Sequence, residues 1–159
     1  MQNQMERLQK LIVELESKIP NQEIINPLVS ISSVGWHIEH SLLTINLVIE
    51  ALQKSDPRLY KWTFNSTRIL VFAMNRIPRG RAKAPKAVQP KLDFDSKSIK
   101  NHLEVAKLKN LEIKSIPEYA YFQHPYFGHL KLKATLRFLQ IHTKHHLAII
   151  NDIIKLDRL

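Results

Sequence analysis

The stretch that decides the fold reads LRFLQIHTKHHLAII (residues 136–150) and lies near the C-terminus. In this stretch and its flanks, apolar residues and two histidines recur at steps of three or four, the spacing of one buried face of a helix. The members of this seam are Leu132, Leu136, Leu139, His142, His146, Ile150 and Ile153. Because side chains four positions apart share a helix face, His142 and His146 are expected to point at one region of the interior. Buried imidazoles need partners, and one metal ion would bind both.

The composition suits a single helical domain. A chain of 159 residues is long enough for one domain with a full hydrophobic core, so we expect one domain over 1–159. Only 3 glycines are present and the 8 prolines cluster between segments, which favours an all-α fold with long helices. The chain has no cysteine, which excludes disulfides, thiolate metal sites and a cysteine nucleophile.

Charge and hydropathy limit the partners. Lysine and arginine exceed aspartate and glutamate by 10, which is compatible with nucleic acid, a membrane surface or small anionic ligands. The N-terminus is amphipathic and charged, without the apolar region of a signal peptide, and no apolar run has the length of a membrane span. We therefore expect a cytoplasmic protein with no membrane partner.

Hydrophobic periodicity predicts five helices. They cover residues 1–19, Ser32 or Ser33 to about Lys54, about Leu59 to Ile77, Asp95 or Ser96 to about Lys114, and Leu130 to Leu156. The third helix would pack through residues such as Trp62 and Phe64, with a kink or its true start near Asn65. The second helix has a narrow polar face that includes Glu39 and Asn46, so we expect it to be central in the fold.

Two long loops are predicted between these helices. Residues 78–95 contain three prolines and a glycine together with five basic residues, which predicts a cationic loop without regular structure. Residues 115–130 are rich in aromatic side chains and are also predicted as a loop. In this second loop, His124 has two possible roles. It is a structural turn residue, because Pro125 and Gly128 both favour a tight turn, or it is a neighbour of the site, because the loop enters the last helix.

Three segments together resemble the DinB superfamily. They are VGWHIEH (residues 34–40), HPYFG (residues 124–128) and the pair His142 and His146 on the last helix. The nearest resemblance is to a branch of unknown function with an HPxFG segment before the last helix. The resemblance implies a four-helix bundle, here with an additional short helix and a long basic loop. It also implies three histidines that bind one divalent metal ion, with nickel or zinc as the usual ions.

The residues of the site follow from this resemblance and from the helix faces. His142 and His146 would be two ligands, and His40 is preferred to His37 as the third because its position matches the family's early histidine better. His37 and His145 are the candidate general bases, since no carboxylate occupies an obvious position for that role. Candidate contacts to substrate are Trp36, His124, Arg79 and Arg81.

The sequence leaves three functions open. The first is a divalent-metal-dependent enzyme, a thiol-dependent S-transferase or a hydrolase, acting on a small anionic or thiol substrate. The second is a bundle that binds a small ligand without catalysis. The third is a basic protein for nucleic acid, which is disfavoured because no binding motif or aromatic stripe accompanies the charge. The resemblance also makes a homodimer an expectation.

Overall fold

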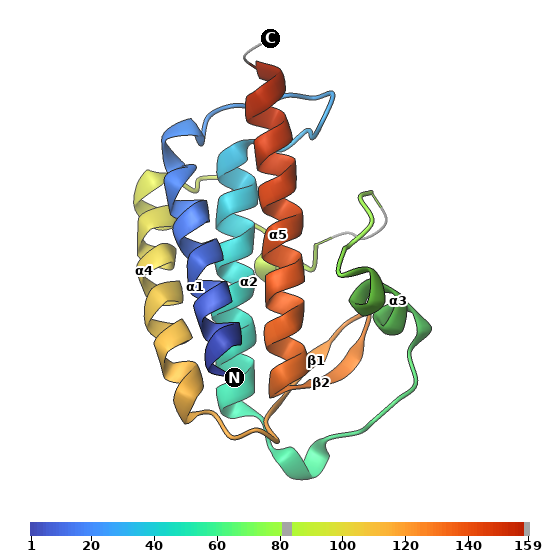
Figure 1. Cartoon of the computed structure of the whole chain (residues 1–159). Coiled ribbons are helices and arrows are strands. Elements are labelled where there is room, and N and C mark those ends of the chain that lie inside the picture. Colours follow the sequence, from blue (N-terminus) through green and yellow to red (C-terminus); the bar gives the residue numbers. More distant parts are fainter. Residues whose placement is uncertain (81–83, 158–159) are drawn as a thin grey trace.

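The computed structural model describes residues 1–80 and 84–157, and its elements are mainly helical (Figure 1). The α-helices are α1 (Gln2–Ser17), α2 (Val34–Lys54), α3 (Ser66–Met74), α4 (Ser96–Glu112) and α5 (Leu132–Asp157). Two strands, β1 (Tyr121–His124) and β2 (Gly128–Lys131), and several short 3-10 turns complete the described chain. The all-α prediction is confirmed, with the small β-hairpin as an addition.

Four of the helices form the bundle. α1 and α2 each pack against both α4 and α5. In the bundle, α1 is therefore diagonally opposite α2, and α4 is diagonally opposite α5. Helix starts follow local chemistry: Ser33 caps α2 by accepting from Trp36 N, and Asp95 caps α4 in a capping box with Ser98. The sequence left two residues open at each of these starts, Ser32 or Ser33 and Asp95 or Ser96, and the structure has Ser33 and Asp95 as the caps.

The buried seam of α5 and the central position of α2 are as predicted. Leu136, Leu139, Ile150 and Ile153 are fully buried, and most residues of α2 are buried. The predicted polar face of α2 is wrong in one respect, because Glu39 is only 2% exposed and Asn46 is also buried. Both side chains face α4: Glu39 Oε1 lies 2.7 Å from His102 Nδ1, and Asn46 Nδ2 donates to the His102 carbonyl.

The aromatic loop predicted over 115–130 is instead a hairpin. β1 pairs antiparallel with β2, with His124 opposite Gly128. Gly128 has φ of +70°, a conformation that L side chains rarely adopt, so glycine at this position permits the tight turn. Aromatic side chains then fill the space between the hairpin and α5, with Phe127 and Phe138 both buried.

The third helix is much shorter than predicted. It starts at Ser66, where Asn65 caps it by accepting from Arg68 N, and residues 60–64 have no regular secondary structure. Trp62 and Phe64 were expected to pack, but they are 67% and 71% exposed. Only Val71 of α3 is buried. Residues 57–92, excluding the undescribed 81–83, are called the basic arm below.

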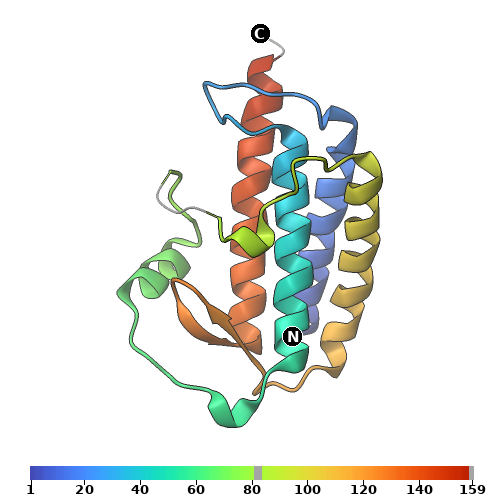
Figure 2. The same cartoon turned by 180° about the vertical axis from the view of Figure 1, so that it is seen from behind.

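The basic arm stands beside the bundle and rests on the hairpin (Figure 2). Asn65 Nδ2 donates to the Tyr126 carbonyl, and Arg68 Nη1 donates to the Phe127 carbonyl. The predicted irregular loop after α3 has one 3-10 turn, Lys86–Val88, which packs against α2. Across the described ranges, 1–80 and 84–157, we find no helix with the length and apolar character needed to cross a membrane.

Candidate metal centre

Three histidines from two helices meet where α2 packs against α5. His40 comes from α2, and His142 and His146 come from successive turns of α5. One ring nitrogen from each lies within 4.8 Å of the other two. His40 Nε2 and His142 Nε2 are 3.1 Å apart. This group of three could hold a metal ion.

His40 is oriented by a backbone carbonyl from the basic arm. Its Nδ1 lies 2.7 Å from the Val88 carbonyl oxygen. A carbonyl can only accept, so Nδ1 carries the hydrogen and Nε2 has a free lone pair. That lone pair faces His142, which is the arrangement in which a neutral imidazole binds a metal through Nε2.

His37 lies behind His146 and does not join the group of three. His37 Nδ1 is 3.0 Å from His146 Nδ1, and His37 Nε2 is 3.0 Å from Ser30 Oγ. If His146 Nδ1 donates to His37, then His37 Nε2 donates to Ser30, and His146 Nε2 has a free lone pair. Both nitrogens of His37 are therefore engaged in orienting its neighbours.

Burial keeps the histidines neutral. Desolvation holds the pKa values of His142 and His146 well below the ordinary value, and nearby histidines lower both further. Burial also lowers the pKa of His40, against the hydrogen bond to Val88, which raises it. Burial, with a contribution from His40, lowers the pKa of His37 to about 4. Neutral imidazoles at neutral pH are the protonation state that a metal requires.

Aromatic rings enclose this group of histidines. Trp36 stacks on His40 with ring centroids 5.0 Å apart and meets His37 edge-on at 5.2 Å. Phe138 lies 5.6 Å from His142 on the other side. Sequence analysis proposed Trp36 as a substrate contact, and the structure places it against the predicted ligand His40.

His145 lies at the boundary between α5 and the basic arm. Its ring meets that of His146 edge-on at 5.1 Å, and it hydrogen-bonds to the backbone of Ile77. Burial and the charge of Arg79 lower its pKa. Arg79 itself pairs with Asp152 at 2.7 Å on α5. Arg81 lies outside the described residues.

His124 contributes to the hairpin turn. Its Nδ1 accepts from the backbone N–H groups of Tyr126 and Phe127, both at 3.1 Å. Its ring stacks on Phe127 at 4.2 Å and meets Phe138 edge-on at 4.5 Å. Burial lowers the pKa of His124 to about 4. Phe138 therefore lies between His124 and His142.

Three side-chain contacts near the site were not predicted from the sequence. Val88 orients His40 from 48 residues away in the chain, so it has no local sequence signal. Ser30 orients His37 from only seven residues away, but it lies before α2, where helical periodicity does not apply. The third is the pair of Glu39 and His102, in which Glu39 Oε2 is buried without a hydrogen-bond partner among the described residues. Burial raises the pKa of Glu39, while His102 lowers it.

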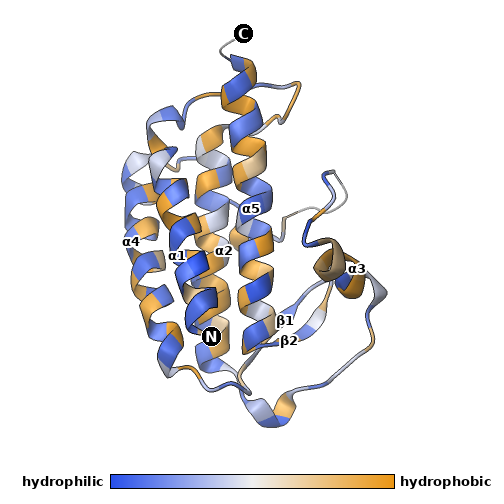
Figure 3. Ribbon diagram, in the orientation of Figure 1, coloured by the Kyte–Doolittle hydropathy of each residue, from blue (hydrophilic) through white to orange (hydrophobic). Residues whose placement is uncertain are grey.

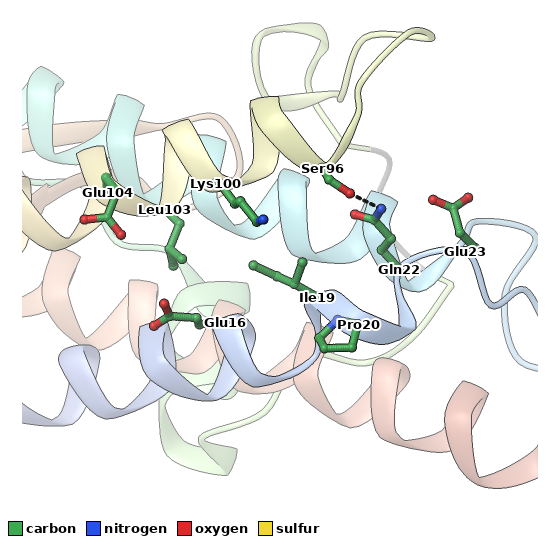
Figure 4. Close-up of a pocket in the computed structure, with 9 residues that line it drawn as sticks. All are labelled: Glu16, Ile19, Pro20, Gln22, Glu23, Ser96, Lys100, Leu103 and Glu104. Atoms are coloured by element: carbon green, nitrogen blue, oxygen red, sulfur yellow. Dashed lines mark hydrogen bonds between the residues drawn. The ribbon is translucent and has the colours of Figure 1, made fainter.

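A surface hollow lies in another part of the described structure. About 680 Å³ in volume, it lies where the end of α1 meets the start of α4, and no histidine lines it (Figure 4). Its walls are Glu16, Ile19, Pro20, Gln22, Glu23, Ser96, Lys100, Leu103 and Glu104. This hollow is therefore separate from the three histidines.

A comparison with known families matches the chain from the start of α2 to near the end of α5, without α1. Residues 32–152 match the family described as "Protein of unknown function (DUF1569)". The chain belongs to this family. The match includes His40, His142 and His146, and it begins just before the Ser33 cap of α2. No curated protein and no solved structure matches the chain.

Proposed function

We propose that this protein is a DinB-like, divalent-metal-dependent enzyme with His40, His142 and His146 as its metal ligands. The carrying observation is the convergence of three ring nitrogens within 4.8 Å at buried and half-buried positions. The chain-wide resemblance in VGWHIEH, HPYFG and the His142–His146 pair supports the DinB-like assignment. Nickel or zinc is the proposed ion, because both accept all-imidazole ligand sets.

The residues present fit such an ion. Nitrogen atoms that bind a tetrahedral ion at about 2.0–2.1 Å lie about 3.4 Å apart. The separation of His40 Nε2 from His142 Nε2 is 3.1 Å, which is close to that value. Val88 and His37 each bind the Nδ1 of one proposed ligand, as the outer partners of metal-bound histidines do. Three protein ligands leave one position open for a substrate or water.

The proposed reaction is S-transfer from a small thiol or hydrolysis. When bound, the metal would lower the pKa of water or of a thiol, so that a nucleophile forms at neutral pH. His145 is the proposed base, because His37 already uses both of its nitrogens. Trp36 beside His40 and Phe138 beside His142 would exclude water from the site.

Substrate contacts are proposed on the side of the basic arm. Arg79 lies close enough to His37 and His145 to lower the pKa of both, which supports recognition of an anionic group there. Arg81 follows two residues later in the sequence and is proposed for the same role. His124 contacts Phe138 rather than the proposed ligands, so its proposed effect on substrate is through that ring.

Elemental analysis of protein purified without a histidine tag tests the metal site. We expect about one nickel or zinc ion per chain, lost in the His142→Ala/His146→Ala variant and retained in His129→Ala. The control histidine stacks on Tyr121, and the structure places it outside the group of three. Absence of bound ion in wild-type protein, even after nickel or zinc is added, would overturn the proposal.

Turnover is tested separately from binding. Metal-loaded protein is assayed for thiol transfer and for hydrolysis, beside His145→Ala, which retains all three proposed ligands. We expect metal-dependent turnover that His145→Ala reduces by about 10²-fold or more while metal content is unchanged. Protein that binds metal but stays inert toward thiols, electrophiles and esters would favour the non-catalytic binding bundle.

A further inference from the structure

The positive charge of this chain is concentrated in one segment. Residues 57–92 contain nine of the 24 lysines and arginines and none of the 14 aspartates and glutamates. The rest of the chain has 15 basic and 14 acidic residues and is therefore almost neutral. Nearly the whole net charge of +10 therefore lies in residues 57–92, and seven of the nine basic residues belong to the basic arm.

The same segment exposes large apolar side chains. The exposed members are Leu59, Trp62, Phe64, Ile69, Leu70, Met74 and Leu92. Figure 3 shows apolar colour over much of α3, although only Val71 of this helix is buried. On α3, Ile69, Leu70, Ala73 and Met74 are all exposed, and the steps of three or four residues from 69 to 73, 70 to 73 and 70 to 74 place them on one side of the helix. Contiguous exposed apolar surface of this kind marks an interaction site.

We propose that the outer surface of the basic arm docks onto an anionic lipid surface. Aliphatic and tryptophan side chains would enter the headgroup boundary, and lysines and arginines would bind acidic headgroups. A fluid lipid surface needs no shape match, which suits the irregular outline of an arm whose described part contains one α-helix of nine residues. This proposal differs from the sequence-based expectation of no membrane partner.

Charge and side-chain chemistry favour lipid over the other occupants. A second copy docked through the same face would bring two acid-free cationic segments together, and like charges across an interface disfavour that contact. Nucleic acid would suit the charge, but bases stack on aromatic rings, whereas most of the exposed apolar side chains are aliphatic. An anionic lipid surface matches both the charge and the aliphatic character.

Co-sedimentation with vesicles tests the docking. The full chain is mixed with vesicles of phosphatidylcholine alone and of phosphatidylcholine with phosphatidylserine, at low and at high salt. We expect binding only to the vesicles with phosphatidylserine, weakened by salt. Lys61→Gln and Lys86→Gln should each weaken binding about fivefold.

A matched pair of leucines distinguishes insertion of the arm's apolar side chains into lipid from non-specific hydrophobic binding. Leu70 on α3 and Leu108 on α4 are 56% and 60% exposed. Leu70→Ser should weaken binding about tenfold, whereas Leu108→Ser should leave it unchanged. Trp62 is exposed, so its fluorescence should shift to shorter wavelength on binding, and Trp62→Phe should remove this shift.

Several results would overturn the docking proposal. They are no binding to vesicles with phosphatidylserine, equal binding to both vesicle types, or equal loss in Leu70→Ser and Leu108→Ser. Dimerisation that Leu70→Ser abolishes, measured by light scattering, would assign the surface to a second copy. Salt-sensitive retention of DNA without vesicle binding would assign it to nucleic acid.

Discussion

The bundle and the basic arm follow different physical rules within one chain. The bundle is nearly neutral and buries its apolar side chains between four helices, whereas the arm is strongly cationic and exposes them. The three histidines lie where the two regions meet, since Val88 of the arm orients His40 of the bundle. The stability of the protein therefore depends mainly on apolar side chains buried in the bundle, whereas most of the large apolar side chains of the arm contribute little to it.

The largest expected difference between the two regions is in core truncation. Leu42 is fully buried on α2, so Leu42→Ala should lower the free energy of unfolding by about 2–5 kcal/mol. Leu70→Ala on the arm should change it by less than about 0.5 kcal/mol, because the side chain is mostly exposed. Urea denaturation followed by circular dichroism measures both. Equal losses would show that α3 is part of the cooperative core.

Metal addition should stabilise the bundle through the three histidines. Nickel or zinc at a hundredfold excess over its dissociation constant should add about 2.7 kcal/mol to the free energy of unfolding. The His142→Ala/His146→Ala variant should show no such gain, whereas Leu70→Ser on the arm should show the full gain. Thermal denaturation with and without metal checks this. A gain that survives the double substitution would place the ion elsewhere.

Acid should lower the stability of the protein through His124, which lies in the hairpin that the basic arm contacts. The pKa of His124 is lowered to about 4 by burial, whereas its ordinary value is 6.5. The unfolded chain therefore binds more protons between these values, so stability is present above pH 6.5 and is lost as pH falls toward 4. From pH 7 to pH 5 the contribution of His124 falls by up to about 2 kcal/mol.

His124→Asn is the matched variant for this prediction. Asparagine can still accept from the turn N–H groups, but it does not titrate. Urea denaturation at pH 7 and pH 5 should show a smaller acid loss in the variant than in wild-type protein. The other buried histidines titrate in both proteins, so only the difference between the two slopes reports on His124. Identical slopes would contradict the burial of its ring.

The smallest expected difference concerns two helix caps of similar chemistry. Asp95 caps α4 in the bundle, and Asn65 caps α3 in the arm. Asp95→Ala should lower global stability by about 1 kcal/mol, whereas Asn65→Ala should change it by less than half of that. Hydrogen exchange should nevertheless show faster exchange in α3 of the Asn65 variant, because the arm opens locally. Equal global losses would show that arm and bundle unfold together.

Local signals predicted most of the bundle. The seam of α5, the Ser33 and Asp95 caps and the central position of α2 depend on nearest neighbours and helical period, which the sequence contains directly. The spacing of His142 and His146 fixed their common helix face. The choice of His40 as their partner depended on the resemblance to a family, because His37 and His40 both lie away from the polar side chains of α2.

Only the tertiary structure decided the contacts between distant segments. Glu39 has the local pattern of a solvated carboxylate, but α4 covers it and supplies His102. Trp62 and Phe64 have the composition of core residues, but Asn65 starts α3 after them and leaves both exposed. Val88 carries no signal in the sequence, because only the fold brings it to His40, 48 residues away. Periodicity reports which face of a helix is apolar, whereas the element that covers that face depends on the path of the whole chain.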